Sequence, residues 1–448
     1  MTAVVRRMAS MCAGRRSWPI WAIAGSVLLL TALISFVLRR NGFSSWANHF
    51  LGWLELDAAD DSWSPMRSAQ AYLAEAADAA QLYTDVFFEI GTKFQYAPTS
   101  LLALEVLDLA WGRPFSTADF SVLNALLLVL NVLAVGMLGW MLARQEGRRD
   151  LACVGFALGC VVALCYYPLL KAYTLGQLQV WINLLFALAC LGWAAGLRGT
   201  AGLLLGLVVL LKPPFALFGL WALWRGERRF LAFFAATAGA GILVSIIRYG
   251  WGVHFAYVDV LRFLSRTGEA FHANQSVNGL LNRLLGTADS LTWSSTGFPT
   301  YHPLVHYGTM VFGLALLFAA WRVFRHPADR ARPAGLVEFQ SVALVATLGS
   351  PIAWEHHYGV LPALYVAMFM LLASKRNAWP GQAQWILLAA SYLLTSTSIP
   401  PLWERWPESP GNLLQSHLLA GALLLLGMQW WFLVTQRRRS PAPAPGFP

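Results

Sequence analysis

Two histidines and a glutamate stand between two apolar runs in the segment from Ser350 to Leu364, "SPIAWEHHYGVLPAL". Glu355, His356 and His357 are consecutive, whereas metal pairs on helices favour i, i+3 or i+4 spacing, so we predict no metal site. Imidazole N–H groups that donate to a phosphate or a sugar hydroxyl fit better. The alternative is that the histidines and Trp354 only anchor a helix end at the membrane interface.

Acidic residues gather in an earlier polar stretch, "LELDAADDSWSPMRSAQAYL", which contains Asp57, Asp60 and Asp61. A carboxylate beside a membrane-embedded cavity could accept the proton of a sugar hydroxyl that attacks an anomeric carbon. Adjacent carboxylates also raise one another's pKa, which suits a base. The alternative is that these are solvated loop charges.

Lys212 lies within an apolar run and directly precedes Pro213 and Pro214. A lysine in such a run is costly and is functional unless it snorkels to the interface. Because two prolines break a helix, we predict two short helices folded into a hairpin with Lys212 at the outer tip. Its compact positive charge could bind a phosphate there.

A second polar stretch, "FHANQSVNGLLNRLLG", combines amide and hydroxyl side chains with an amphipathic end. Asn274 or Ser276 is a natural cap for a surface helix, and Asn274 also begins a glycosylation sequon. Basic residues on the expected external side favour an anionic ligand. These residues are Arg248, Arg262, Arg266 and Arg283.

The composition predicts the elements that must hold these residues. Of the 448 residues 57% are hydrophobic and 12% are charged, which is typical of a multi-pass membrane protein. The net charge of +10 comes mostly from short loops between apolar runs, so it indicates topology and not nucleic-acid binding. The five cysteines offer neither a disulfide framework nor zinc spacing.

We therefore predict an all-α protein with about ten full transmembrane helices plus the short Pro-broken hairpin. The run Trp18–Leu38 follows several arginines and is expected to be an uncleaved anchor that leaves the N-terminus in the cytoplasm. The same alternation puts the C-terminus there too, so both termini are cytoplasmic.

One membrane-embedded domain, residues 18–435, is expected between a cytoplasmic tail at 1–17 and a disordered Pro-rich tail at 436–448. The two long external loops span about 39–117 and 248–302. In the first loop, Arg67–Leu82 and Thr99–Ala110 have the apolar spacing of surface helices.

Several segments, in the same order along the chain, resemble the motifs of glycosyltransferase family 87, whose members are membrane-embedded and use polyprenyl-phosphate sugars. They include an Asp-led loop, an aromatic-Tyr-Pro-Pro stretch, for which this chain has Tyr96-Ala97-Pro98, a Gly-Gln helix and a Lys-Pro hairpin, followed by an Asn-Gln-Ser segment and a Ser-Pro-x-x-Trp-x-His-His motif. In this chain they are "DSWSPMRSAQAYLAEA", "FQYAPTSLLALEVL", "TLGQLQVWINLLFALACL", "AGLLLGLVVLLKPPFAL", "NQSVNGLLNRLLG" and "SPIAWEHHYGVLPAL".

The resemblance implies a C-type glycosyltransferase architecture. It also implies transfer, with inversion, of a hexose such as mannose or of a pentose from a polyprenyl-phosphate donor to a lipid or glycan acceptor outside the cell membrane. By position it makes Asp61 the general base. Asp60 and Asp57 remain alternatives because Ser64-Pro65 stands where the family has Val-Tyr.

The resemblance also implies a set of donor-binding residues. Lys212, His356 and His357 match positions facing the donor phosphate, Asn274 and Gln275 match positions lining the cavity, and Tyr96 and Gln177 fall in motifs of the same set.

Two other classes of function stay open at this point. The helix number and the broken hairpin are compatible with a transporter or lipid flippase, although the second half has no matching broken hairpin. Long external loops are also compatible with a non-catalytic assembly protein of the cell envelope. We predict no firm cofactor and no nucleic-acid partner, membrane lipids and the two substrates as partners, and a bacterial inner membrane as the location. The oligomeric state stays open.

Overall fold

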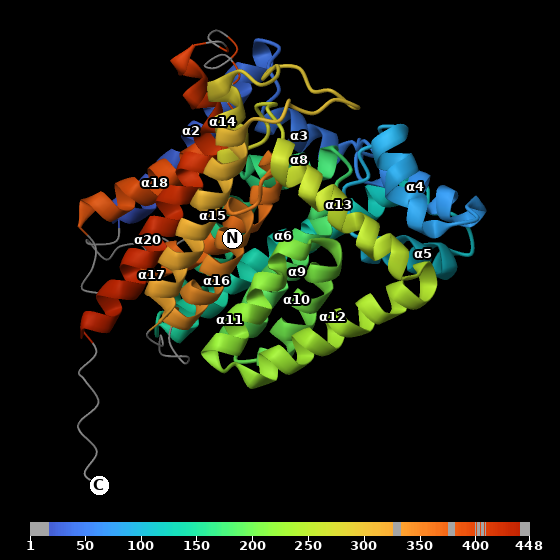
Figure 1. Ribbon diagram of the computed structural model, residues 1–448. Helices are drawn as coiled ribbons and strands as arrows, with labels where there is room; N and C mark the ends of the chain where they lie inside the picture. The colour runs from blue at the N-terminus through green and yellow to red at the C-terminus, as the bar shows by residue number, and fades with distance from the viewer. Residues whose placement is uncertain are drawn as a thin grey trace.

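The computed structural model describes residues 18–325, 333–374, 381–398 and 409–439, with single positions at 400, 404 and 407. The predicted all-α class is confirmed: within these residues the chain forms helices and no strand, apart from one isolated bridge. Both predicted tails fall largely or wholly outside the described residues. Figure 1 shows the helices packed side by side, with α4 and α5 at one side.

The first half of the chain begins with the 23-residue helix α2, which matches the first predicted apolar run. The bounds are α2 (Trp18–Arg40), α3 (Trp46–Leu54), α4 (Trp63–Glu75), α5 (Leu101–Trp111), α6 (Thr117–Gln145), α7 (Ala152–Leu164), α8 (Tyr167–Thr174), α9 (Gln179–Ala194), α10 (Arg198–Leu211) and α11 (Leu217–Arg225).

The helices of the second half pack against this group. The bounds are α12 (Arg228–Tyr249), α13 (Trp251–Thr267), α14 (Val277–Leu285), α15 (Pro303–Phe324), α16 (Pro333–Leu348), α17 (Leu361–Ala373), α18 (Gln382–Ser396) and α20 (His417–Arg439).

Five helices in the described part of the chain are long and apolar enough to span a membrane, or six if the bent pair α7–α8 is one span. They are α6, α12, α15, the stretch Glu355–Ala373 and the stretch Pro410–Gln436. The predicted number of about ten full spans is not confirmed, because α9, α10 and α16 are apolar but too short. The protein is nevertheless a multi-pass membrane protein.

The apolar run around Lys212 forms two short helices, and the chain reverses between them. Gly202 of α10 packs against Phe230 of α12, and Gly206 packs against Phe234, so α10 and α12 run in the same direction. The intervening helix α11 must therefore run back. The break between α10 and α11 lies at Lys212 and Pro213, as the two prolines predict.

Helices α6 and α7 touch through their backbones. A Cβ atom on Gly139 would overlap the carbonyl oxygen of Gly155, and one on Gly159 would overlap that of Val135. Gly155 and Gly159 have the four-residue spacing that lets membrane helices approach closely. This contact fixes the position of α7, which is followed by α8 and then by the turn between α8 and α9.

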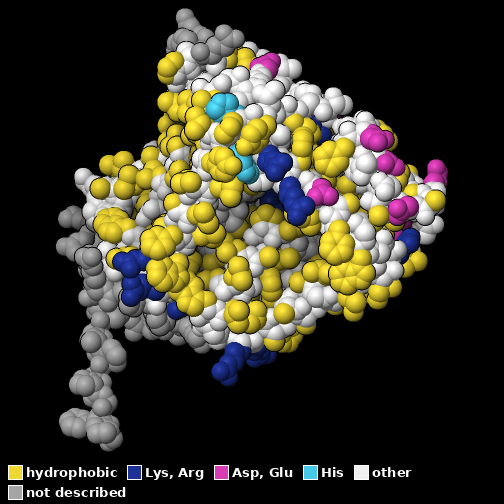
Figure 2. Space-filling model, viewed as in Figure 1, with side chains coloured by type: hydrophobic (Ala, Val, Ile, Leu, Met, Phe, Trp, Pro, Cys, Tyr) yellow, Lys and Arg dark blue, Asp and Glu magenta, His cyan; other side chains and the backbone are white. Residues whose placement is uncertain are grey.

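A separate apolar cluster joins α4 and α5 with α13 in the predicted external layer. The sequence predicted a helix over Arg67–Leu82, but α4 begins at Trp63 and ends at Glu75. In Figure 2 hydrophobic side chains cover much of the visible face, and acidic side chains gather at the α4 end. One group of basic side chains lies at the lower edge where α11 meets α12, and others lie at the centre and the sides of this face.

Candidate functional site

Asp61 is held by the corner between α8 and α9. Ala59 N donates to Thr174 O at 2.8 Å, Asp61 N donates to Leu175 O at 3.0 Å, and the next residue repeats the pattern on Gly176 O. Gly176 has φ +66°, and a Cβ atom there would overlap the Ala59 carbonyl oxygen. Glycine is therefore needed both for its backbone conformation and for the approach of the aspartate loop.

Neutral hydrogen-bonding groups orient the Asp61 carboxylate. Gln177 Nε2 donates to it, while Gln177 Oε1 accepts from the Ser62 hydroxyl at 2.8 Å and from the Tyr96 hydroxyl at 3.3 Å. These two donors fix which end of the amide faces the aspartate. We call Asp61, Ser62, Tyr96 and Gln177 the aspartate side. Tyr96 and Gln177 were predicted among the donor ligands, and the structure places both beside Asp61.

Asp61 lies in a recess, because its side chain is open to solvent although protein surrounds it closely. Burial raises the pKa of Asp61 above its usual value, the hydrogen bond from Gln177 opposes this, and the charge of Asp60 adds to it. Asp57 and Asp60 are exposed, and neither carboxylate bonds to another described side chain. Among the three candidates, Asp61 therefore has the environment that suits a base.

The two histidines lie in a 3₁₀ turn, Glu355–Val360, that leads into α17. His356 is buried, and its Nε2 has no hydrogen-bond partner among the described residues. His357 Nδ1 accepts the Trp354 N–H at 3.2 Å, so its own proton lies on Nε2 and can be donated. The two rings are 4.7 Å apart between centroids.

Lys212 reaches the same place from the break between α10 and α11. Its ammonium donates to Gln179 Oε1 at 2.9 Å and lies close enough to His356 and His357 to act on both electrostatically. Gln179 in turn donates to Asn183 at 2.8 Å. We call Lys212, Gln179, His356 and His357 the histidine side. The structure thus brings together three residues that the sequence predicted as phosphate ligands.

Glu355 belongs to the same turn but has a different role. Its Oε2 accepts from the Tyr167 hydroxyl at 3.0 Å and from the Lys171 ammonium, both on α8. The sequence analysis missed Lys171, whose only signal was a lysine in an apolar segment, "YPLLKAYT". The ion pair fastens the histidine turn to α8, which also leads to the aspartate loop.

Asn274 and Gln275, which were predicted to line the cavity, are both fully buried in the structure. Asn274 donates to Glu269 O at 2.9 Å and accepts from Ala353 N at 2.9 Å. Gln275 Oε1 accepts from Leu418 N at 3.1 Å, at the start of α20. These amides are used inside the protein, where Asn274 attaches the loop before α14 to the segment that precedes the histidine turn and Gln275 attaches it to the start of α20.

The arginines of the second loop are mostly used within the protein, which weakens the expectation of an anionic ligand there. Arg248 pairs with Glu105 at 3.2 Å, and Arg262 pairs with its neighbour Asp259 at 2.8 Å. Arg283 is buried and donates to the Asn274 carbonyl at 2.9 Å. The predicted cap is confirmed, since the Ser276 hydroxyl accepts from Gly279 N at 3.0 Å at the start of α14.

No three His, Cys, Asp or Glu side chains of the described residues converge as metal ligands. The absence of a metal requirement stays a prediction. The described residues thus provide one carboxylate that can accept a proton, and a cation and an imidazole N–H that can stabilise negative charge.

Comparison with known proteins shows the family to which the chain belongs. Residues 94–351, more than half of the chain, match the model of glycosyltransferase family 87. This range contains Tyr96, Gln177 and Lys212, whereas Asp61 and the two histidines lie outside it.

Two relatives from Mycolicibacterium smegmatis match over most of their length. A polyprenol-phosphate-mannose-dependent alpha-(1-2)-phosphatidylinositol mannoside mannosyltransferase is 26% identical over 375 residues, which is 79% of this chain and 78% of the relative. A polyprenol-phosphate-mannose-dependent alpha-(1-2)-phosphatidylinositol pentamannoside mannosyltransferase is 27% identical over 332 residues, covering 72% and 73%.

Proposed function

Because the chain belongs to glycosyltransferase family 87, we propose that this glycosyltransferase moves a hexose or pentose from a polyprenyl-phosphate donor to a lipid or glycan acceptor. Mannose is the favoured sugar, since both relatives are named as polyprenol-phosphate-mannose-dependent enzymes. A phosphatidylinositol mannoside or a related glycolipid is the favoured class of acceptor on the same ground. Transfer takes place on the extracytoplasmic face of the cell membrane, with both termini in the cytoplasm.

Asp61 acts as the general base in this proposal. It takes the proton of the acceptor hydroxyl while that oxygen forms a bond to the anomeric carbon of the donor sugar. The bond between the anomeric carbon and the phosphate oxygen breaks on the opposite side, so the configuration inverts. Polyprenyl phosphate leaves with the electron pair and an additional negative charge.

The histidine side stabilises that charge. The Lys212 ammonium and the His357 Nε2–H are donors that can face the departing phosphate oxygens, where such groups contribute most to the rate. His356, with its unpartnered nitrogen in the same turn, completes the set. A lipid-linked donor has to reach these groups from the membrane plane, which fits a site carried between apolar helices.

One observation carries this proposal. Gln177 donates to Asp61, and Gln179, two residues further on, accepts from Lys212. The short segment 177–179 that leads into α9 therefore contacts both the base and the cation, and on this ground we assign the aspartate side and the histidine side to a single site. Neither a solvated loop carboxylate nor a snorkelling lysine explains that shared contact.

The test uses purified protein in lipid nanodiscs, a panel of radiolabelled polyprenyl-phosphate sugars and a membrane lipid extract as the source of acceptor. We expect Asp61→Asn to lower the transfer rate by roughly 10²- to 10⁴-fold, the usual contribution of a general base. Asp60→Asn is the matched control and is expected to keep nearly the full rate.

Full activity of the Asp61→Asn protein would show that another group is the base. A larger loss in Asp60→Asn than in Asp61→Asn would transfer the role to the neighbouring carboxylate. Absence of transfer from every donor by well-folded wild-type protein would count against the proposed reaction itself.

A further inference from the structure

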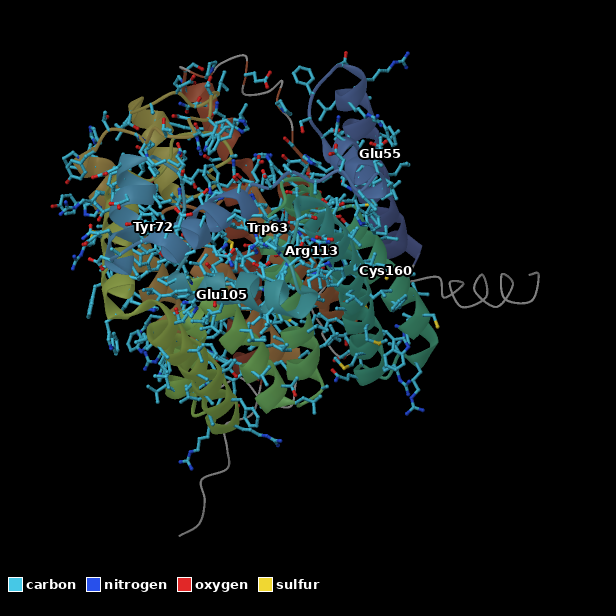
Figure 3. All side chains as sticks on the ribbon, turned by 90° about the vertical axis from the view of Figure 1, so that its right-hand side faces the viewer. Glu55, Trp63, Tyr72, Glu105, Arg113 and Cys160 are labelled. Carbon is cyan, nitrogen blue, oxygen red and sulfur yellow. The ribbon has the colours of Figure 1, made fainter. Side chains whose placement is uncertain are left out.

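A cleft of about 570 Å³ lies between α4, α5 and the end of α12. Its wall includes Arg67 and Gln70 of α4, Glu105 and Asp108 of α5, and Tyr249. Figure 3 faces this side of the molecule, with Glu105 of α5 labelled. We call it the α4–α5 cleft. Its volume is within the range of small-molecule sites.

One end of the cleft is rigid. Arg67 donates to both carboxylate oxygens of Asp108, at 2.5 and 2.7 Å, and to Phe115 O at 2.8 Å. Gln70 Nε2 adds a further bond to Asp108 at 3.1 Å. Arg67 lies in the second turn of α4, whose first residue Trp63 follows Asp61 by two positions. The rigid end is thus built on the helix that directly follows the proposed base.

The other end is more open. Arg248 pairs with Glu105 through one contact of 3.2 Å, and the Arg248 side chain is 61% exposed. The Tyr249 side chain is buried, and its hydroxyl interacts with Glu105. Because Arg248 and Glu105 share a single contact of 3.2 Å and both are partly exposed, their remaining donor and acceptor positions are available to a ligand.

The charges of the cleft balance, with Arg67 and Arg248 opposite Glu105 and Asp108. A site for an anion or a cation would carry an excess of the opposite charge. Fixed donors beside fixed acceptors, without net charge, instead match the neighbouring hydroxyl groups of a neutral carbohydrate.

Apolar side chains surround the cleft on the same helices. Leu109 and Val106 of α5 are 85% and 64% exposed, and Ile247 near the end of α12 is 76% exposed. Helix α12 is one of the candidate spans and ends at Tyr249, so Arg248 and Tyr249 stand where lipid headgroups meet water. The cleft therefore opens beside lipid tails while presenting polar groups at headgroup depth.

We propose that the α4–α5 cleft binds the carbohydrate headgroup of a glycolipid acceptor, with its lipid chains along α5 and α12. This inference rests on the proposed function, because it assigns the acceptor of that same reaction. It makes Arg248, Glu105 and Tyr249 specificity-determining residues for the acceptor. The donor and its phosphate stay on the histidine side.

The test measures equilibrium binding of radiolabelled alkyl mannosides with one to four sugars to the nanodisc-embedded protein. Wild-type protein is expected to bind them saturably and more tightly as the second sugar is added. Ala74→Trp, which fills the cleft from the exposed side of α4, is expected to weaken binding at least tenfold. Ser68→Trp places the same side chain on the exposed surface of α4 outside the cleft and should bind like wild type.

Arg248→Ala and Glu105→Gln are milder variants and are each expected to weaken binding severalfold. In transfer assays Ala74→Trp should raise the KM for the glycolipid acceptor and leave the KM for the donor unchanged. Unchanged binding in Ala74→Trp, or an equal loss in Ser68→Trp, would overturn the assignment of the cleft. Binding that depends on the cleft in a protein that transfers no sugar would instead count against the proposed function and leave the cleft assigned.

Discussion

The aspartate side and the histidine side of the site are built in different ways. Around Asp61 the partners are neutral: an amide, two hydroxyls and a line of backbone hydrogen bonds. On the histidine side the Lys212 ammonium and two imidazoles lie close together in a largely buried region. The buried ion pair between Lys171 and Glu355 involves the same histidine turn. The base thus depends on backbone position, whereas the proposed phosphate site depends on charge.

The two sides meet at the corner between α8 and α9. Gly176 and Gln177 hold the aspartate loop, Gln179 holds Lys212, and Lys171 holds Glu355 of the histidine turn. If the comparison is right, substitutions in this corner can damage one side and leave the other nearly intact. Three variants, each with a matched control, test that separation.

The largest effect is expected from Gly176→Ala, which acts on the aspartate side. An alanine in this left-handed conformation costs about 1–3 kcal/mol, and its Cβ atom would also displace the aspartate loop at Ala59. A misplaced base lowers the rate by about 10²-fold. Steady-state kinetics should therefore show a large fall in kcat and little change in donor affinity.

Gly196→Ala is the matched control, because Gly196 has φ +78° but nothing within 4 Å of its Cβ position. It imposes the same backbone strain without moving the loop and is expected to keep the rate near that of wild type. Equal losses in the two variants would mean that strain alone, and not the position of Asp61, causes the effect.

An intermediate effect is expected from Lys212→Met, which removes the cation of the histidine side and keeps an unbranched side chain. Loss of one charge–phosphate contact should weaken binding of the donor about tenfold, which corresponds to about 1.4 kcal/mol. The KM for the acceptor should stay near its wild-type value. Kinetics with one donor and one acceptor, each varied in turn, measure both.

Gln179→Met separates the charge of Lys212 from its support, because it removes the oxygen that Lys212 bonds and leaves the ammonium in place. We expect a smaller loss of donor affinity than in Lys212→Met. An equal loss would show that Lys212 matters for its contact with Gln179 and not for a phosphate.

The smallest effect concerns the charge that links the two sides. Lys171 lowers the pKa of Asp61, together with Lys93, while Asp60 raises it. A base works when deprotonated, so a higher pKa moves the acidic limb of the kcat/KM profile to higher pH. Lys171→Met combined with Glu355→Gln should therefore lose activity at a higher pH than wild type on the acidic side of the kcat/KM profile, and the effect should be small.

Glu355→Gln alone keeps the positive charge of Lys171 and is the control for the double variant. Its acidic limb should not move to higher pH. The double variant avoids leaving Glu355 buried without its partner, which would be destabilising. Identical profiles for the single and double variants would exclude an electrostatic effect of Lys171 on Asp61.

The sequence predicted the helical class well, and some boundaries less well, for physical reasons. Apolar composition and two prolines were sufficient to locate the break at Lys212. The apolar composition of a segment does not indicate a bend, however, and the apolar helix α7 ends at Leu164 and is followed by α8 at an angle of 54°. The length of an apolar helix decides whether it can span a membrane, and α9, α10 and α16 are too short to do so.

Sequence motifs identified candidate site residues that carry reactive groups. Contacts between residues far apart in the sequence could not be identified in this way, because only the folded chain brings them together. Lys212, His356 and His357 do lie together on the histidine side. Lys171 pairs with Glu355 across 184 positions of the chain, which no local spacing indicates. Polar amides were expected to line the cavity, yet Asn274 satisfies buried backbone groups that only the folded chain brings near.

The buried position of Asn274 has a consequence for producing the protein. Its sequon, Asn274-Gln275-Ser276, is fully buried, and its amide nitrogen bonds to Glu269 O and Pro351 O. A host that attaches a bulky glycan to this asparagine while the chain is still unfolded would stop the loop from docking on the histidine turn. Expression in a eukaryotic secretory pathway should then yield misfolded protein, and Ser276→Ala would remove the sequon at the cost of the cap on α14.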